Sequence, residues 1–348
     1  MTYILDQVAQ PQSNRIGPPV FDAQSLALRL GIRRRTLWWL VLSNKGDPKG
    51  PKLYRHITIP KDNGGLRHLH EPCDPLKAVQ KVLLLRFFAQ YETTPAHVAA
   101  YVMGRSTLEA AQQHVGAAVK ISVDIKNFFP STTRKMVRAY LRREQFSEEL
   151  VSILSNLLTV PLWTDLGVRS CLPQGSPTSA AVANRIAMDL IDAPLLAELP
   201  DDATYTRYCD NLEVSFKRDR SREEIDAYKV RIQEIVEAAG YRLNHKKTKI
   251  QRLTSPKIPM RVLGINTNTK TNIPSKKYRR LRLLIHQVKT RGLTDTYHTS
   301  NLVDRTLMMS PAHLKASLMG ELQYWHRVNP AKMTTLIETL RQAEEATP

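Results

Sequence analysis

The spacing of apolar residues predicts two stretches of strand that carry the acidic residues of greatest interest. In residues 120–125 apolar positions alternate with polar ones, the period of a strand with one buried face, so Asp124 is expected to point away from the apolar side. In residues 205–216 two alternating segments flank a polar turn. This predicts a β-hairpin with Asp210 and Asn211 at its tip. Taken alone, the second stretch is equally compatible with an ordinary Asp-Asn turn.

Helical and hairpin patterns follow along the rest of the chain. Residues 21–43 predict two short helices separated at Gly31. They form either a helical pair packed through its leucines or the start of a helix-turn-helix with the arginine run 33–35 toward a phosphate backbone. Residues 54–70 alternate around an Asn-Gly-Gly turn, which predicts another hairpin. Further elements are expected as helices at 76–90, 104–114 (N-cap Ser106), 222–239 and from 275 onward, a turn and strand at 240–250, and a short strand at 262–266.

Residues 171–192 combine a tight loop with a helix. Gln174 and Gly175 form the loop, Ser176 is a natural N-cap, and Pro177 takes the first helical position. The helix that follows is rich in small residues. These permit close approach of a flat partner such as a base pair, and equally close packing of another helix.

The composition adds a strong positive charge. The chain has 348 residues with 51 Lys and Arg against 32 Asp and Glu, a formal net charge of +19. This excess indicates a polyanionic partner, first of all nucleic acid. The longest apolar run is far too short to span a bilayer and the first residues lack a signal-peptide pattern, so no membrane partner is expected. Three cysteines at wide spacing favour a reducing, cytoplasmic location without disulfides.

The charge gives the two acidic stretches a specific meaning. If the strand at 120–125 lies beside the hairpin at 205–216, the carboxylates of Asp124 and Asp210 converge. Two such carboxylates repel each other unless hard cations such as Mg²⁺ neutralise them. Two metal ions that bridge aspartates and a triphosphate are the usual arrangement for in-line nucleotidyl transfer. These residues therefore indicate a metal-dependent reaction of nucleotides.

The order of the motifs resembles that of a bacterial reverse transcriptase, most closely one of the retron type. The resemblance covers residues 54–330. It rests on Ile-Pro-Lys from Ile59 with Gly-Gly-Leu-Arg to Arg67, Asp-Ile-Lys-Asn-Phe-Phe-Pro-Ser at 124–131, Leu-Pro-Gln-Gly-Ser-Pro-Thr-Ser at 172–179, Tyr-Cys-Asp-Asn at 208–211 and Asn-His-Lys-Lys-Thr at 244–248. Residues 110–114 and 262–264 also resemble the NAxxH and VTG elements of retron enzymes.

The resemblance implies an α+β fold, a right-hand polymerase with fingers, a palm of antiparallel sheet and helices, and a helical thumb. The expected boundaries are an N-terminal helical extension at 1–50, fingers at 51–120, palm at 121–270 and thumb at 271–348, with residues 171–192 at the junction of fingers and palm. The implied activity is RNA-directed DNA polymerisation with two Mg²⁺ ions, which Mn²⁺ can replace.

The same resemblance implies roles for individual residues. Asp124, Asp210 and the Ile125 carbonyl are expected to bind the metal ions, and Lys247 to protonate the leaving pyrophosphate. Lys61 and Arg67 are expected to contact the triphosphate, Gln174 and Gly175 the nucleotide and template, while Phe129 excludes a ribose 2′-hydroxyl. The basic residues expected to bind nucleic acid through the helix from 275 are Lys276, Lys277, Arg279, Arg280, Arg282, Lys289 and Arg291.

Three residues depart from the family's pattern. The hairpin normally ends in two aspartates, and the second is Asn211 here. Asn211 is still expected in the catalytic site, where it offers an acceptor oxygen. Loss of a supporting carboxylate is expected to cost about 10- to 100-fold in metal affinity or activity. Ala110 replaces the asparagine of NAxxH and Leu263 the threonine of VTG, so the departures concern RNA recognition more than the chemistry.

Three functions are compatible with the sequence. The first is a reverse transcriptase that copies part of a structured noncoding RNA into RNA-linked single-stranded DNA (msDNA) from dNTPs, within a retron antiviral defence system that includes a separate effector protein. Its synthesis would start from the 2′-hydroxyl of a guanosine in the RNA. The second is a catalytically silent, polymerase-like scaffold that binds RNA. The third is a template-independent or protein-primed polymerase of phage defence.

Overall fold

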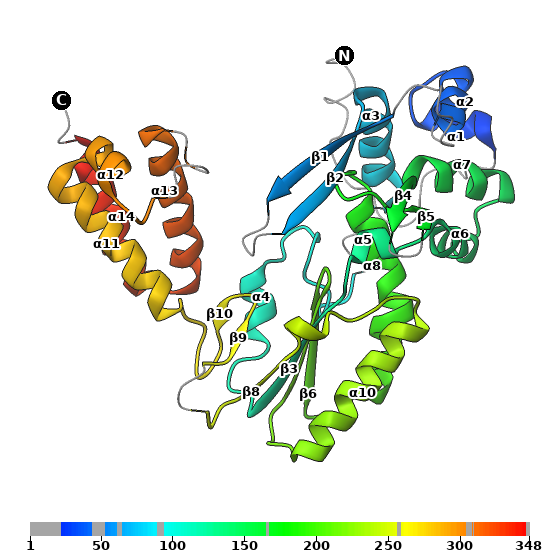
Figure 1. Ribbon diagram of the computed structural model, residues 1–348. Coiled ribbons are helices and arrows are strands. Elements are labelled where there is room, and N and C mark those ends of the chain that lie inside the picture. The colour runs from blue at the N-terminus through cyan, green and yellow to red at the C-terminus, as the bar shows by residue number, and fades with distance from the viewer. Residues whose placement is uncertain are drawn as a thin grey trace. The chain divides into compact units, whose positions relative to one another are not determined.

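The computed structural model describes residues 22–43, 53–60, 65–88, 94–164, 167–255, 259–303, 308 and 310–345. The chain forms two compact units, whose helices and strands are labelled in Figure 1. The first unit comprises Met1–Thr94, Lys126–Ile191 and Ala239–Tyr241, and the second comprises Pro95–Ile125, Asp192–Ala238 and Arg242–Pro348. Each unit therefore joins segments that are distant in the sequence, and residues 126–191 of the predicted palm belong to the first unit.

The first unit combines helices with two separate β-hairpins. Strands β1 (Tyr54–Pro60) and β2 (Leu66–Pro72) pair antiparallel, as do β4 (Val160–Thr164) and β5 (Gly167–Cys171). The first pair confirms the hairpin predicted at 54–70, whose turn residues 61–64 lie outside the described part of the chain. The helices of this unit are α1 (Ala23–Arg29), α2 (Arg34–Ser43), α3 (Asp74–Leu83) with a π-helical turn at Leu84–Phe88, α5 (Phe128–Ser131), α6 (Arg134–Arg143), α7 (Glu148–Leu158) and α8 (Ser179–Ala187).

Helices α1 and α2 confirm the helical pair predicted at residues 21–43. α1 begins with a capping box in which the Asp22 side chain accepts a hydrogen bond from the Ser25 N–H. The chain turns at Gly31, whose φ of +69° lies in the left-handed region that favours glycine. Leu26 and Leu37 are both 0% exposed, so the pair packs through its leucines.

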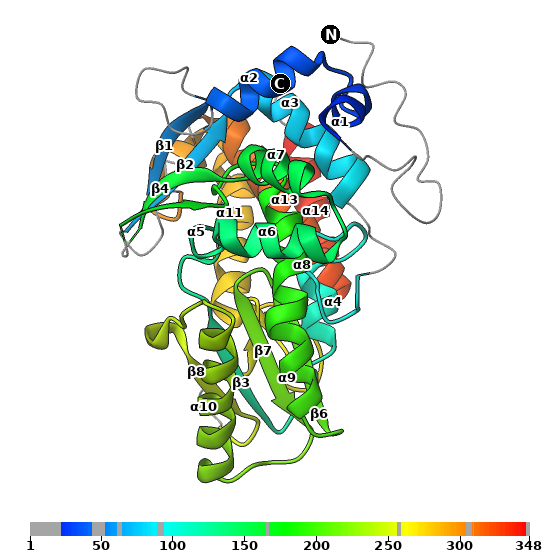
Figure 2. The same ribbon diagram turned by 90° about the vertical axis from the view of Figure 1, so that its right-hand side faces the viewer.

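A four-stranded antiparallel sheet forms the core of the second unit. Its strands lie in the spatial order β6 (Ala203–Tyr208), β7 (Asn211–Phe216), β3 (Val119–Asp124) and β8 (Lys249–Arg252). Helices α9 (Ala193–Glu198) and α10 (Arg222–Ala238) lie over one face of this sheet (Figure 2). The rings of Phe216 and Tyr228 are 4.8 Å apart where α10 packs on β7. The mixture of helices with an antiparallel sheet confirms the predicted α+β class.

The polar face of β3 is buried, which corrects the prediction of a strand with one solvent-facing side. Lys120 is 0% exposed and Asp124 is 5% exposed. The Lys120 Nζ lies 2.7 Å from Glu213 Oε2 on β7, and the Ser122 hydroxyl donates to the same carboxylate at 2.6 Å. Because the partner lies 93 positions away in the sequence, alternation within β3 could not reveal that its polar face is paired inside the unit.

Two further local predictions are wrong. Helix α8 begins at Ser179 after Thr178, not at Pro177 after Ser176, and the Ser176 hydroxyl donates to Gln80 Oε1 at 2.9 Å. Residues 262–266 form two strands, β9 (Arg261–Val262) and β10 (Ile265–Asn266), instead of one. Leu263 and Gly264 join them with positive φ values of 49° and 86°, which turns the chain back on itself.

Four helices pack together at the C-terminal end of the second unit. They are α11 (Ser275–Arg291), α12 (Leu293–Thr299), α13 (Pro311–Val328) and α14 (Pro330–Glu345). α11 confirms the basic helix predicted from residue 275, and its Leu281 and Leu284 join Leu314 and Trp325 of α13 in one buried cluster. The cations of α11 other than Arg280 are thereby left exposed. In the part of the chain that the structure describes, no helix is both long and apolar enough to cross a membrane.

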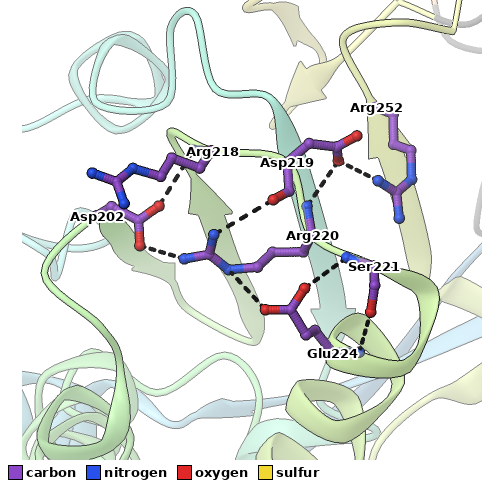
Figure 3. A network of polar contacts seen from close by, with 7 residues as sticks. All are labelled: Asp202, Arg218, Asp219, Arg220, Ser221, Glu224 and Arg252. Carbon is purple, nitrogen blue, oxygen red and sulfur yellow. Dashed lines mark hydrogen bonds and ion pairs between the residues drawn. The ribbon is translucent and has the colours of Figure 1, made fainter.

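Ion pairs connect the strand ends that lie farthest from the 209–210 turn (Figure 3). Arg220 reaches Asp202, which precedes β6, and Glu224 on α10. Asp219, which follows β7, pairs with Arg252 at the end of β8. Single exposed pairs contribute little to stability, but a network that links three strands and a helix holds this end of the sheet in register.

Candidate active site

The pairing of β3 with β7 brings the two predicted catalytic aspartates together. Asp124, the last residue of β3, is the register partner of Asn211, the first residue of β7. The Ile125 N–H donates to the Asp210 carbonyl oxygen at 2.8 Å, which anchors the hairpin turn to the chain beyond β3. The two carboxylates therefore lie at the same end of two adjacent strands, as predicted from the sequence.

The turn itself differs by one residue from the prediction. Cys209 and Asp210, not Asp210 and Asn211, form the two-residue connection between β6 and β7. Cys209 has a φ of +59°, a conformation that residues other than glycine rarely adopt. Its thiol is buried, and burial raises the pKa of Cys209 to about 12, so the sulfur stays protonated beside Asp210. A strained two-residue turn thus places Asp210 at the tip.

The two carboxylates of Asp124 and Asp210 repel each other, and a nearby positive charge would stabilise them. Burial, together with the negative charge of Asp124, raises the pKa of the Asp210 carboxyl above its usual range. The Lys247 Nζ lies 2.8 Å from Asp124 Oδ2 and partly offsets this repulsion. Lys247 follows Asn244, whose N–H donates to the Asp124 carbonyl oxygen at 2.7 Å, so the segment before β8 closes over the same strand end.

The side chain of Asn211 bonds to the neighbouring Asp210 through its amide nitrogen. The Asn211 Nδ2 donates to Asp210 Oδ1 at 3.1 Å. A carboxylate in the same place would repel Asp210, whereas the amide orients it. The substitution therefore supplies a hydrogen bond to Asp210 and removes one negative charge from the site.

Two supports of this hairpin have no counterpart among the sequence predictions. Tyr101 has a φ of +57° and a side chain 56% exposed, and its hydroxyl forms a hydrogen bond with Cys209. Arg207, 0% exposed on β6, binds Asp192 in a bidentate manner: its Nε donates to Oδ1 and its Nη2 to Oδ2, each at 2.8 Å. Asp192 also accepts a hydrogen bond from the Tyr205 hydroxyl. Tyr101 belongs to no predicted element, whereas Arg207 is a charged residue inside the alternating segment 205–208, and that position was the one signal in the sequence.

The residues predicted to contact the nucleotide belong to the first unit. Arg67 is exposed on β2, opposite Ile59 of β1, and Phe129 is half-buried in α5. Gln174 and Gly175 lie directly beside β2, because the His70 N–H donates to the Gln174 carbonyl oxygen at 2.7 Å. Lys61 lies outside the described residues. Arg67, Gln174 and Gly175 are thus gathered on the β1–β2 hairpin and the loop next to it.

The basic residues predicted on the helix from 275 lie on α11, and six of the seven are exposed. The exception is Arg280, whose guanidinium pairs with Glu321 of α13 at 2.9 Å. A groove of about 470 Å³ between α11 and α14 is lined by Arg279, Arg282 and Lys289 together with the exposed Leu283. This face therefore carries clustered positive charge suited to a phosphate backbone.

The two segments that resemble retron elements touch each other in the second unit. Helix α4 (Thr107–Gln112) begins at the predicted N-cap Ser106, and its Ala111 packs against Val262 and Ile265 of the β9–β10 hairpin. His114 is 1% exposed, and its ring nitrogens contact Ser215 Oγ at 2.7 Å and Thr206 Oγ1 at 2.8 Å. Burial, assisted by the charge of Lys120, lowers the pKa of His114 to about 3. His114 is therefore neutral and links β6 and β7 of the sheet through its two hydrogen bonds.

The sequence of the chain is similar to those of several known proteins. The family described as "Reverse transcriptase (RNA-dependent DNA polymerase)" matches residues 59–267. The chain is 30% identical over 320 residues to the retron Mx65 reverse transcriptase of Myxococcus xanthus, a match that covers 87% of this chain and 72% of that protein. It is 32% identical over 294 residues to the retron Mx162 reverse transcriptase of the same organism, covering 77% of this chain and 59% of that protein.

A further match is the retron Ec73 reverse transcriptase of Escherichia coli, 33% identical over 218 residues, 59% of this chain and 65% of that protein. Among solved structures, a telomerase from Candida tropicalis in complex with a fragment of telomeric RNA is similar at 13% identity and a TM-score of 0.47, covering 84% of this chain and 53% of that one. The family match spans more than half of the chain and includes both aspartates of the β3–β7 pair. The chain therefore belongs to the reverse transcriptase family and, within it, to the retron reverse transcriptases.

Proposed function

We propose that this chain polymerises DNA on an RNA template with Asp124 and Asp210 as its catalytic carboxylates. The observation that carries the proposal is the pairing of β3 with β7, which holds both residues at one end of adjacent strands. The raised pKa of the Asp210 carboxyl supports it: burial is the larger cause, and the negative charge of Asp124 adds to it. Membership of the reverse transcriptase family supplies the reaction class.

The carboxylate pair fits Mg²⁺, and Mn²⁺ as its substitute. Mg²⁺ is usually held by one or two carboxylates plus substrate phosphates and water, not by a complete protein cage. Two aspartates with the Ile125 carbonyl oxygen match the first of these patterns, and the described residues contain no cluster of three or more His, Cys, Asp or Glu side chains that would form a complete cage. A bound pair of Mg²⁺ ions would supply charge neutralisation at the attacking and leaving oxygens.

The chain's own residues complete the proposed site. Lys247, which reaches Asp124 in the free protein, would deliver a proton from its Nζ to the leaving pyrophosphate. Lys61 and Arg67 would hold the triphosphate, and Gln174 with Gly175 would contact the nucleotide and template. Phe129 would exclude a ribose 2′-hydroxyl, so that dNTPs are the substrates. These roles follow from the positions of the residues in the family's motifs.

The partner is proposed to be a structured noncoding RNA, part of which is copied into single-stranded DNA that stays linked to it. The relatives named as retron reverse transcriptases support this. The cations on the outer face of α11 would contact the RNA and its RNA–DNA product. We assign the chain to a retron defence system in which a separate protein is the effector. Sequencing of nucleic acid that copurifies with the chain should then yield DNA joined to RNA; unlinked DNA would contradict this assignment.

Primer extension on polyriboadenylate with an oligodeoxythymidylate primer, dNTPs and either Mg²⁺ or Mn²⁺ tests the activity. We expect the wild-type chain to incorporate nucleotides and Asp124→Asn or Asp210→Asn to lose about 1,000-fold, the equivalent of about 4 kcal/mol for a direct ligand. Asp226→Asn on the exposed face of α10 is the matched control. If neither metal supports extension and Asp124→Asn leaves the biological activity intact, the chain is an RNA-binding scaffold instead.

A further inference from the structure

A buried glutamine joins three separate elements of the first unit. Gln80, on α3, is 0% exposed. Its Nε2 donates to the Tyr54 hydroxyl of β1 at 2.9 Å and to the Leu157 carbonyl oxygen of α7 at 2.9 Å, while its Oε1 accepts from the Ser176 hydroxyl at 2.9 Å. Because the Leu157 carbonyl can only accept, the orientation of the amide is determined. Three hydrogen bonds of one side chain therefore hold a strand, a helix and a loop together.

The third of these partners lies in the loop predicted to bind the nucleotide. Ser176 follows Gln174 and Gly175 directly and is buried. Its hydroxyl also accepts from the Thr178 N–H at 3.3 Å, so the contact with Gln80 fixes the loop immediately before α8. The position of the predicted nucleotide contacts thus depends on Gln80, which is 96 residues away from Ser176 and has no place in the family's motif.

The same loop is pressed against β2 from the other side. The His70 N–H donates to the Gln174 carbonyl oxygen, and Gly175 approaches so closely that a Cβ on it would lie 3.1 Å from the His70 carbonyl oxygen. Gly175 also has a φ of +121°, which a larger residue would adopt only under strain. The glycine is therefore required by backbone packing within the first unit, whether or not it also touches a nucleotide.

Gln80 contacts both the β1–β2 hairpin and the loop that packs against it. Through Tyr54 it fixes the start of β1, and through Ser176 it fixes the loop that lies against β2. Burial raises the pKa of the Tyr54 hydroxyl, so this group remains a neutral hydrogen-bond partner. Removal of the amide would leave the Tyr54, Leu157 and Ser176 groups buried without their partner, and such groups are costly to leave unpaired.

We propose that Gln80 is a positioning residue for nucleotide binding: it holds residues 174–176 in one conformation against the β1–β2 hairpin and so sets the affinity for the incoming dNTP. The inference rests on the proposed polymerase function. It assigns to Gln80 no contact with substrate, so its loss acts through the loop. The expected signature is a higher KM for dNTP with little change in kcat, because a looser loop weakens binding before the carboxylates act.

Ser176→Ala tests the proposal with the smallest perturbation. It removes the hydroxyl that joins the loop to Gln80 and leaves the bonds to Tyr54 and Leu157 in place. Ser155→Ala is the matched control, since Ser155 is also 0% exposed in the first unit and its hydroxyl donates within α7 to the Ser152 carbonyl oxygen. We expect Ser176→Ala and Gln80→Met to raise the KM for dNTP about tenfold, with kcat within about twofold and Ser155→Ala unchanged.

Hydrogen exchange provides a second measurement that does not need activity. Peptides that cover residues 66–72 and 172–178 should exchange about tenfold faster in Gln80→Met and Ser176→Ala than in Ser155→Ala, because the His70 amide and the loop lose their fixed partner. Unchanged exchange and unchanged KM in Ser176→Ala would overturn the inference, as would an equal effect of Ser155→Ala. If the wild type lacks polymerase activity but the exchange result holds, the positioning role stands and the proposed function fails.

Discussion

The amide of Asn211 makes a sharp prediction about metal dependence. Asn211→Asp restores the second aspartate that is usual in this family. It replaces the amide NH₂ group by an oxygen and leaves the size and shape of the side chain nearly unchanged. In the free protein the hydrogen bond from Nδ2 to Asp210 Oδ1, 3.1 Å long, is replaced by two facing carboxylates. The variant therefore exchanges an attraction for a repulsion at the catalytic turn, and only a cation can reverse the sign.

The magnitude follows from the geometry. Two unit charges 3.1 Å apart repel by about 5 kcal/mol at an effective dielectric constant of about 20. Rotation of the new carboxylate toward solvent reduces this, because Asn211 is only half-buried. The lost hydrogen bond to a charged group adds about 1.5–3 kcal/mol. We expect the metal-free variant to be destabilised by about 2–4 kcal/mol, with the divalent ion held about 10-fold more tightly.

Two assays follow from these numbers. A Mg²⁺ titration of primer extension should reach half-maximal rate at about one-tenth of the wild-type concentration. In thermal unfolding, the variant should melt below the wild type without metal and gain more from saturating Mg²⁺, because a tenfold tighter site adds about 1.4 kcal/mol. Asp226→Asn serves again as the charge-changing control on α10.

A wild-type response of Asn211→Asp to Mg²⁺ would refute this prediction. If Asn211→Asp shows the wild-type Mg²⁺ midpoint and the wild-type metal-induced shift in melting temperature, position 211 does not face the metal site. An equal loss of stability with and without Mg²⁺ would lead to the same conclusion. Either outcome would leave Asn211 as a residue that only shapes the turn.

Three other predictions concern stability and RNA binding. His114→Gln should flatten the pH dependence of the free energy of unfolding. The pKa of His114 is about 3 in the folded state and about 6.5 in the unfolded state, so between these values only the unfolded state takes up the proton. The free energy of unfolding of the wild type therefore falls by about 1.4 kcal/mol for each pH unit below 6.5. Urea unfolding at pH 5 to 7 should show this slope; an identical slope in the variant would contradict it. Lys120→Met should cost about 3–5 kcal/mol because it leaves Glu213 buried and unpaired, and Lys120→Met with Glu213→Leu should recover most of that loss. Arg279→Ala with Arg282→Ala should reduce the salt dependence of RNA binding by about two phosphate contacts; an unchanged slope would place the RNA elsewhere.

Local patterns were sufficient for much of the fold. Alternation and turn residues predicted the hairpin of β1 and β2 and the strands that carry Asp124 and Asp210, while the adjacency of those strands was a condition that the structure fulfils. Capping residues and apolar stripes predicted α4 and α11, because a cap or a stripe depends on residues within a few positions of each other. The order of short motifs then indicated the family.

The failures share one physical cause. Alternation in β3 predicted a solvent-facing side, yet Lys120 is buried against Glu213. Helix α8 begins at Ser179 although Ser176 is a preferred N-cap residue, and the Ser176 hydroxyl is instead bonded to Gln80 of another helix. In each case a polar side chain is bonded to a group that lies outside its own local sequence pattern.

The amino-acid sequence by itself determined which segments become helices and strands, where the family's motifs lie, and that the surface is strongly basic. Only the tertiary structure decided which polar groups are buried, which partner each one takes, and how the carboxylates at the catalytic turn are charged and oriented. The reason is that periodicity is a property of neighbouring residues, whereas desolvation and pairing depend on chain segments that fold together from far apart, as Lys247 does with Asp124 across 123 positions.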